Sequence, residues 1–431
     1  MKYASLAIST LLLLTSLAPA QDEPVAFVGA KIIPIVGDPI AHGTIVVHKG
    51  RIVAVGPDAG FADAQRVDCT GKVIMPGLVD THSHIGGGWA ADSSGPIQPD
   101  VRVLDSVNVR DSGFVRARAG GMTTLNVMPG SGHLLSGQTI YLKLRKARTI
   151  EEMAIHDEAG NILGGMKMAN GTNSQREAPF PGTRSKSAAL IREKFVKAQE
   201  YRRKLQQAGD DPEKRPERDL EMEGLLEVLD GKRIVHHHTH RADDILTVIR
   251  LSQEFHFRVV LHHVSEGWKV AEEIAKAGVP CSIILVDSPG GKIEARDLLL
   301  NTGAVLEKAG VLTAYHSDDW ITDSRHFLRS AALGVRAGMS REKALYAMTM
   351  AGAKMIDLDK RIGSLEPGKD ADFIILSGDP LSVYTKVLET YVEGEKVFDR
   401  SDPKDYLYAV GGYGAGRDQE MHLCCFETGE K

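Results

Sequence analysis

Short apolar runs alternate with longer amphipathic segments through the middle of the chain, a rhythm typical of parallel βαβ units. Eight of the apolar runs predict strands, at residues 78–82, 123–128, 139–142, 165–168, 233–238, 258–263, 281–286 and 311–316. Helical patterns fall between them at residues 188–207, 243–254, 270–277 and 343–353. Eight strands in this rhythm favour an α/β fold of the closed (β/α)8 TIM barrel type over a doubly wound sheet.

Both ends of the chain carry β-type patterns instead. These lie at residues 26–35, 43–47 and 51–57, and again at 371–376 and 386–398; the turn His48-Lys49-Gly50 predicts a hairpin. Two β-rich ends around a long middle predict one small β-sandwich domain built from both termini. The expected division is 21–75 and 359–400 for the sandwich, 76–358 for the barrel and 401–431 for a C-terminal tail. The charged stretch 209–223 predicts a solvated loop leading into a helix.

The first twenty residues are expected to be a targeting segment. Lys2 is followed by a short apolar run over residues 4–17, and Ala18-Pro19-Ala20 matches a small-x-small cleavage site. The apolar run is shorter than the roughly 20 residues that span a bilayer, so a cleaved signal peptide is favoured over an anchor. We therefore expect an exported protein, periplasmic or extracellular, that starts near Gln21 and has no membrane span after cleavage.

Composition and the number of cysteines argue against two kinds of binding, to nucleic acid and to zinc through thiolates. Of the 431 residues, 42% are hydrophobic and 25% charged, with a net charge of −5 and interspersed signs. A nucleic-acid partner would call for a clustered basic face, so none is expected. The four cysteines are Cys69, Cys281, Cys424 and Cys425, with no CxxC motif, which argues against thiolate zinc ligation. Cys281 is expected to be buried, and the role of Cys424 and Cys425 is open.

Metal-type side chains recur where the predicted strands end, which is where (β/α)8 barrels carry their active sites. The first strand ends in Asp80-Thr81-His82-Ser83-His84. Residues at i and i+2 of a strand share a face, so His82 and His84 can reach one ion. Imidazole suits zinc and related divalent ions.

Two longer stretches resemble a known family. The run GKVIMPGLVDTHSH at residues 71–84 resembles the GKxxxPGxxDxHxH opening of the amidohydrolase superfamily, and GSLEPGKDAD at 363–372 is similar to the turn by which these enzymes re-enter their β-sandwich. The two matches bracket the barrel. The resemblance, to the imidazolonepropionase-like and prolidase-like subgroup, implies a metal-dependent hydrolase acting on carbon–nitrogen bonds.

The resemblance also implies further metal ligands. In the segment 236–240, strand alternation puts His236, His238 and His240 on one face, and similarity to an H-A-[HD]-R-x-D-D-I motif favours His238, with His240 as the alternative. Of the adjacent His262 and His263, which alternation sends to opposite faces, the family position is His263; His262 is expected to face the surrounding helices.

Strands four and eight supply the remaining positions. Lys167 matches the lysine that many family members convert to a metal-bridging carbamate; uncarbamylated, it could be a charge partner for substrate. Asp318 matches the family's aspartate, and a shift of one residue would exchange it for Asp319. The loops at 129–133, near His156 and at 173–184 are expected to open onto the site.

The implied mechanism is attack by a metal-activated water, with Asp318 carrying the proton to the leaving nitrogen and His263, or a second metal, polarising the carbonyl. One or two divalent ions, zinc first, are expected. The expected substrate is a small amide, cyclic amide or dipeptide. A secreted prolidase-like dipeptidase is the alternative activity, and a non-catalytic barrel used as a binding scaffold is the alternative class. A homo-oligomer is left open.

Overall fold

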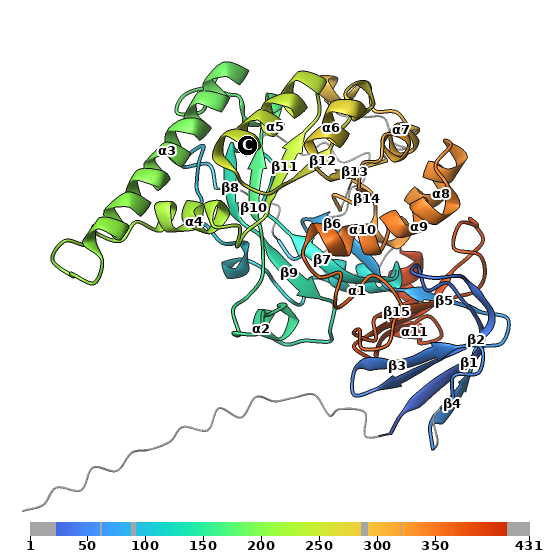
Figure 1. Ribbon diagram of the computed structural model, residues 1–431. Helices are drawn as coiled ribbons and strands as arrows, with labels where there is room; N and C mark the ends of the chain where they lie inside the picture. The colour runs from blue at the N-terminus through green and yellow to red at the C-terminus, as the bar shows by residue number, and fades with distance from the viewer. Residues whose placement is uncertain (1–22, 61–62, 88–91, 286–291, 320, 412–431) are drawn as a thin grey trace, which may run out of the picture.

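The computed structural model describes residues 23–60, 63–87, 92–285, 292–319 and 321–411 (Figure 1). The expected signal peptide at 1–20 and the pair Cys424 and Cys425 lie outside the described residues. Cys281 and Cys69 are both buried and unpaired, which confirms the expectation for Cys281.

Strands from the two ends of the chain form one sheet of eight strands. Its order is β17-β16-β15-β5-β1-β2-β3, with β4 paired to β1. The strands are β1 (Val25–Ile32), β2 (Ile40–His48), β3 (Arg51–Gly56), β4 (Gln65–Asp68), β5 (Val73–Pro76), β15 (Phe373–Leu376), β16 (Val387–Val392) and β17 (Glu395–Asp399). The two ends meet where Phe373 of β15 pairs with Pro76 of β5. The predicted hairpin joins β2 to β3, with Lys49 and Gly50 both at positive φ.

The middle of the chain forms a three-stranded and a six-stranded sheet. The first has the order β6-β7-β9 and the second β14-β13-β12-β11-β10-β8, and an isolated bridge from Ser83 to Asp319 links them. Among the described residues they do not form one closed sheet. The strands are β6 (Leu78–Ser83), β7 (Met122–Val127), β8 (Leu135–Gln138), β9 (Ile140–Lys143), β10 (Met166–Ala169), β11 (Val235–Thr239), β12 (Val259–His263), β13 (Cys281–Ile283) and β14 (Thr313–Tyr315).

The predicted third strand departs from the parallel pattern. The extended run from Leu135 to Lys143 pairs antiparallel with β10 through β8 and antiparallel with β7 through β9. Its carboxyl end therefore points away from the carboxyl ends of the parallel strands, and Lys143 bonds to Asp370 beside the terminal sheet. The expectation that the segment near His156 opens onto the site is wrong for this reason: the carbonyl of His156 instead accepts a hydrogen bond from Arg361.

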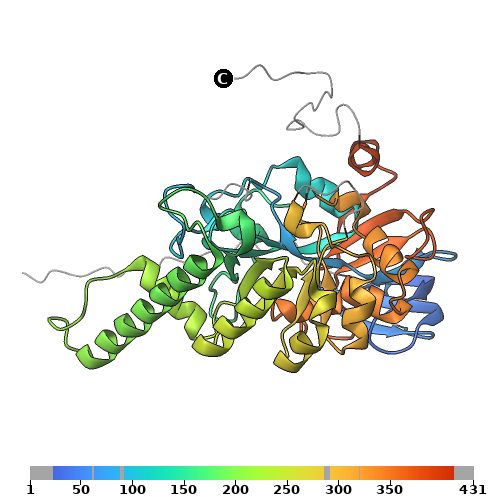
Figure 2. The ribbon, with the colours of Figure 1, turned by 90° about the horizontal axis from the view of Figure 1, so that it is seen from above.

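Eleven helices lie around these sheets in the described residues. They are α1 (Ser112–Ala119), α2 (Ile150–Met153), α3 (Arg184–Ala208), α4 (Leu220–Leu229), α5 (Ala242–Phe255), α6 (Ala271–Ala277), α7 (Thr302–Lys308), α8 (Arg329–Arg336), α9 (Arg341–Ala347), α10 (Met350–Met355) and α11 (Pro403–Val410). Figure 2 shows α3 projecting from the body on the side away from the terminal sheet. The predicted helix at 343–353 is divided into α9 and α10, and α4 begins inside the predicted loop 209–223, capped by Asp219.

Burial explains why these segments pack as they do. Strands β6, β7, β9, β10, β11 and β12 are buried at every position, as expected for strands covered on both sides. Helix α3 packs through Phe195, whose ring stacks on Phe255 at the end of α5 and on Phe257. No helix in the described part of the chain combines the length and apolar character that crossing a membrane requires.

Candidate active site

The predicted pair on the first strand meets an aspartate that follows β14, a strand of the other central sheet. The Nε2 atoms of His82 and His84 lie 3.3 Å apart, and Oδ1 of Asp318 lies 3.4 Å from the first and 3.1 Å from the second. The backbone N–H of Asp318 donates to the carbonyl of His82, which holds the two segments together. The three ligand atoms lie within 4.8 Å of one another, a spacing at which one ion can bind all three.

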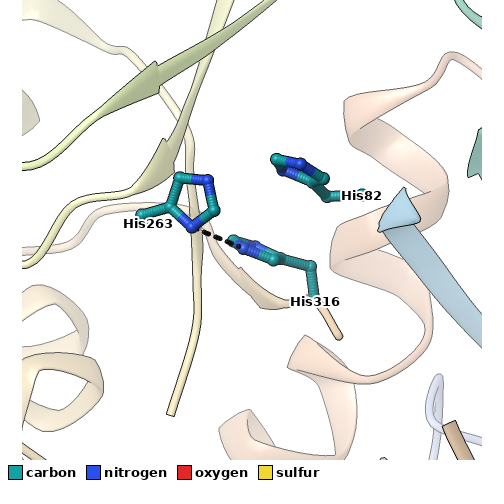
Figure 3. Close-up of side chains that lie close together, drawn as sticks. All are labelled: His82, His263 and His316. Atoms are coloured by element: carbon teal, nitrogen blue, oxygen red, sulfur yellow. Dashed lines mark hydrogen bonds between the residues drawn. The ribbon is translucent and has the colours of Figure 1, made fainter. Parts of the chain in front are cut away.

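A second group shares His82 and adds His263 and His316 (Figure 3). Nε2 of His316 lies 3.2 Å from Nδ1 of His263, and Nδ1 of His316 lies 2.9 Å from the hydroxyl of Ser282. The figure shows three imidazole rings from separate strand ends that face one another. His316 carries no role in the predictions from sequence, although its place at the end of the eighth strand was a usable signal.

Lys167 on β10 lies among these rings. Its Nζ is 3.0 Å from Nε2 of His82 and 3.1 Å from the sulfur of Met128, and its side chain is fully buried. Burial lowers the pKa of this amine to about 7. A lowered pKa makes the neutral form of the amine, the form that reacts to give a carbamate, more accessible at neutral pH.

The two alternatives on the fifth strand both face the site. The ring of His238 lies 4.3 Å from that of His263 and 4.6 Å from that of His240. His238 and His240 also form a third group of candidate ligands, together with Glu294. The structure thus brings both histidines together rather than selecting one, and Glu294 went unnoticed in the sequence.

His262 does not face the surrounding helices, so that expectation is wrong. Its Nδ1 lies 3.2 Å from Nδ1 of His82, and its Nε2 lies 3.0 Å from Nδ1 of His236. The physical reason is the backbone of His263, whose φ of 70° ends the extended conformation on which side-chain alternation depends. Nε2 of His236 in turn lies 3.1 Å from the hydroxyl of Tyr141. A chain of buried hydrogen bonds thus supports His82 from behind.

The two neighbouring aspartates after the eighth strand have different surroundings. The carboxylate of Asp319 accepts a hydrogen bond from the backbone N–H of Ser324, and burial raises its pKa to about 6. Asp318 is partly exposed; burial raises its pKa, but the hydrogen bond and charge of His84 outweigh that effect and hold it below the usual value. Asp318 is therefore the carboxylate that faces the histidines.

A divalent ion fits the side chains at this site. Among the described residues, both ring nitrogens of His238, Nε2 of His240 and Nε2 of His263 are buried without a hydrogen-bond partner. Burial keeps the pKa of His82, His238 and His263 well below the usual value, so these imidazoles are neutral, the form that binds metals. Nδ1 of His84 lies 2.8 Å from the carbonyl of Met128, which leaves its Nε2 lone pair free for an ion.

Two of the predicted loops meet beside this site. Arg176 donates a hydrogen bond to the carbonyl of Gly132, joining the segments 173–184 and 129–133. Arg184 pairs with Asp244 and with Glu294, at 2.8 and 3.2 Å. Since Glu294 belongs to the third group of candidate ligands, this loop reaches the edge of the histidine cluster.

Comparisons with known proteins fit this geometry. A family model described as the amidohydrolase family matches residues 73–397. The amidohydrolase tasK of Hapsidospora irregularis is 26% identical over 83% of this chain, and the chain covers 40% of its length. An imidazolonepropionase of Rhizobium rhizogenes is 30% identical over 30% of this chain and 38% of its own. The chain thus spans well under half the length of both.

Among solved structures, an amidohydrolase from Thermotoga maritima MSB8 is 35% identical with a TM-score of 0.82, covering 87% of this chain and 100% of that one. A prolidase complexed with N-methylphosphonate-L-proline has a TM-score of 0.55 at 17% identity, covering 87% of this chain and 99% of that one, which bears on the fold alone. The predicted resemblance, to imidazolonepropionase-like and prolidase-like proteins, is confirmed.

Proposed function

The chain belongs to the amidohydrolase family, and from that premise we propose that it is an exported, metal-dependent hydrolase that cleaves a carbon–nitrogen bond in a small amide, cyclic amide or dipeptide. The observation that carries the proposal is the convergence of His82, His84 and Asp318, with ligand atoms within 4.8 Å of one another. These residues come from opposite ends of the barrel segment, and a purely structural role does not require their convergence.

The proposed ligands are the six residues that the family resemblance names: His82, His84, Lys167, His238, His263 and Asp318. These residues would hold one or two zinc ions, and Lys167 would be carbamylated where two are held. When bound, a divalent ion would lower the pKa of its water to about 7, which would supply a nucleophile at neutral pH.

Asp318 is proposed to take the proton from the attacking water and deliver it to the leaving nitrogen. Its carboxylate is partly exposed, while its backbone N–H is held by His82, so the group is both accessible and fixed in place. Proton transfer by a positioned side chain contributes about 10²–10⁴-fold to the rate. Asp319, which accepts from Ser324, is not needed for this step.

His263 is proposed to bind metal or to polarise the substrate carbonyl. Its Nδ1 lies 3.2 Å from Nε2 of His316 and 4.0 Å from Oδ2 of Asp318, while its Nε2 is buried without a hydrogen-bond partner among the described residues. As a neutral ring it offers a lone pair at one nitrogen and an N–H at the other.

Two finer proposals concern the scaffold and the substrate. We propose that the two central sheets are the wall of one (β/α)8 barrel and that the terminal sheet is its β-sandwich. A secreted prolidase-like dipeptidase remains the second candidate activity, because the sequence motifs resemble the prolidase-like as well as the imidazolonepropionase-like subgroup. A non-catalytic scaffold is a weaker candidate, because losses at ligand positions would be expected and none of the six is lost.

Metal analysis followed by a substrate screen tests the proposal. The mature protein, dialysed against metal-free buffer, is expected to retain zinc, and His82→Ala and His84→Ala are each expected to hold less zinc than the wild type because each removes a ligand. The zinc-loaded protein is then assayed on N-acyl amino acids, cyclic amides and dipeptides, including Xaa-Pro. Zinc content unchanged by either substitution would contradict the ligand assignment, and a metal-bearing protein inactive on every class would favour the scaffold.

A further inference from the structure

The third group of candidate ligands lies to one side of the His82–His84–Asp318 group. His238 and His240 come from the end of β11, and Glu294 comes from the 3-10 turn η4 (Ile293–Ala295) after β13. One ligand atom of each lies within 4.8 Å of the other two. Only 2% of His238 and 6% of each of the other two residues is exposed, so the three groups face one another away from bulk water.

Two of these side chains are held by the atom that faces away from the group. Nδ1 of His240 lies 2.7 Å from the hydroxyl of Ser265. Oε2 of Glu294 accepts hydrogen bonds from the backbone N–H of Thr172 at 2.9 Å and from Arg184 at 3.2 Å. Hydrogen bonds of this kind are what orient the ligands of protein metal sites.

The opposite atoms have no partner. Nε2 of His240, Oε1 of Glu294 and both ring nitrogens of His238 are buried without a hydrogen bond among the described residues. Buried polar atoms are nearly always satisfied, so four such atoms close together indicate a ligand. Carboxylate oxygens and the lone pairs of neutral imidazoles are electron donors, and the ligand they fit is a cation.

We propose that His238, His240 and Glu294 bind a divalent cation of their own, zinc by the chemistry of the ligands, beside the His82–His84–Asp318 group. Two imidazoles and one carboxylate are a known zinc ligand set that leaves a fourth position for water or substrate. This proposal rests on the proposed function only because His238 is a ligand in both. It adds His240 and Glu294 as ligands, and the proposed function requires neither of them.

The decisive variant is Glu294→Gln, which keeps the side chain's size but removes its charge. Zinc-loaded mature protein is passed through a desalting column, and bound zinc is measured by mass spectrometry. The variant is expected to hold one zinc fewer per chain than the wild type. Glu307→Gln is the matched control, since this carboxylate also accepts two protein hydrogen bonds, both from Ser340, and should retain the wild-type zinc content. Equal zinc in Glu294→Gln and the wild type would overturn the proposal.

Two further variants keep all three ligand residues unsubstituted and cover the case in which Glu294→Gln fails to fold. In Gly171→Ala, the added Cβ would lie 2.7 Å from Oε2 of Glu294 and displace it, so one zinc should again be lost. Ser265→Ala removes the partner of His240 and should weaken zinc binding by about 10–100-fold. Unchanged zinc affinity in both would refute the site.

The double substitution of His82 and His84 by Ala separates this proposal from the proposed function. This double variant should still hold the zinc bound by His238, His240 and Glu294. Complete loss of zinc from the double variant would count against an independent site. Failure of the proposed function would appear instead as an absence of hydrolysis across all substrate classes, whatever the zinc content.

Discussion

At the scale of single residues, the site depends on which nitrogen of each imidazole is engaged by the protein. Nδ1 of His84 is engaged by the carbonyl of Met128, and Nδ1 of His316 by the hydroxyl of Ser282. Each contact restricts the ring and leaves Nε2 toward the centre of the site. These contacts fix the orientation of the rings before an ion binds, so the side chains lose less conformational freedom when it does.

The role of Asp318 can be separated from metal binding. Asp318→Asn keeps an oxygen near His82 and His84 but cannot accept a proton at neutral pH. We expect zinc content close to that of the wild type and a fall in kcat of about 10²–10⁴-fold. Steady-state kinetics on the substrate found by screening, with zinc analysis of the same sample, measures both. Near-wild-type turnover would assign the proton transfer to another group, and Asp319→Asn serves as the neighbouring control.

At the scale of elements, the antiparallel β9 connects the active-site strands to the terminal sheet. Lys143 at its end is 1% exposed in its side chain and pairs with Asp370 at 2.8 Å and with Asp372. Arg361 also pairs with Asp370, whereas among the described residues Asp372 forms its ion pair with Lys143. β9, which runs antiparallel to β7, is thus also the strand whose end links the central sheets to the terminal sheet.

Removing the charge of Lys143 should destabilise the fold. Lys143→Met keeps most of the side-chain volume but leaves the carboxylate of Asp372 buried without its cation, a change that costs about 3–5 kcal/mol when one partner of a buried pair is removed. Urea unfolding followed by circular dichroism measures the loss. Lys197→Met, which removes an exposed partner of Glu193, is the control and should change stability little. A loss below about 1 kcal/mol for Lys143→Met would contradict the assigned role.

Glu393 makes the stability of this junction between β9 and the terminal sheet depend on pH. Burial raises the pKa of this carboxyl, but hydrogen bonds from Arg145 and the charge of Lys143 outweigh that effect and lower it from 4.5 to about 2. Because the folded pKa is lower than the unfolded one, the stabilisation is present above pH 4.5 and is lost as pH falls toward 2.

Across this acidic range, the melting temperature of the wild type should therefore fall more steeply with decreasing pH than that of Glu393→Gln. The variant has no proton to gain at this position. The variant is expected to be less stable than the wild type at pH 7, with the difference shrinking on acidification. If the melting temperatures of the two proteins fall by the same amount between pH 4.5 and 2, Glu393 does not supply this pH dependence.

At the scale of the whole molecule, the two ends of the chain have to meet for the fold to close. β5 pairs with β1 from the N-terminal part and with β15 from the C-terminal part, so one strand carries both halves of the terminal sheet. β6 follows β5 after Gly77 alone and ends at Ser83, the residue before His84. The position of the first candidate ligands is thereby set by a sheet that is complete only when residues 373–399 are present.

Processing of the N-terminus is the matching prediction at this scale. Expressed from Met1 in a bacterial host, the protein is predicted to be exported and to begin at Gln21, because Ala18-Pro19-Ala20 presents small residues at the cleavage positions. Mass spectrometry of the protein recovered from the periplasm and medium measures the mass. Ala18→Leu and Ala20→Leu, combined, should block cleavage. An exported product that retains Met1 would contradict the signal-peptide interpretation.

Local patterns in the sequence determined much of this protein. Apolar periodicity located the buried strands, and strand alternation together with the family motif identified His82, His84 and Asp318, which the structure brings within ligand distance of one another. These inferences succeed because a strand's periodicity and the reach of an i, i+2 pair are properties of a few consecutive residues.

Only the tertiary structure decided the rest. The direction of β9 is a relation to β7 and cannot be read from its own residues. His262 faces the site because the backbone turns at His263, a conformation that the side-chain pattern does not encode. Glu294 joins His240 from a turn that follows a different strand. Each of these depends on contacts between segments far apart in the chain, which form only when the whole chain packs.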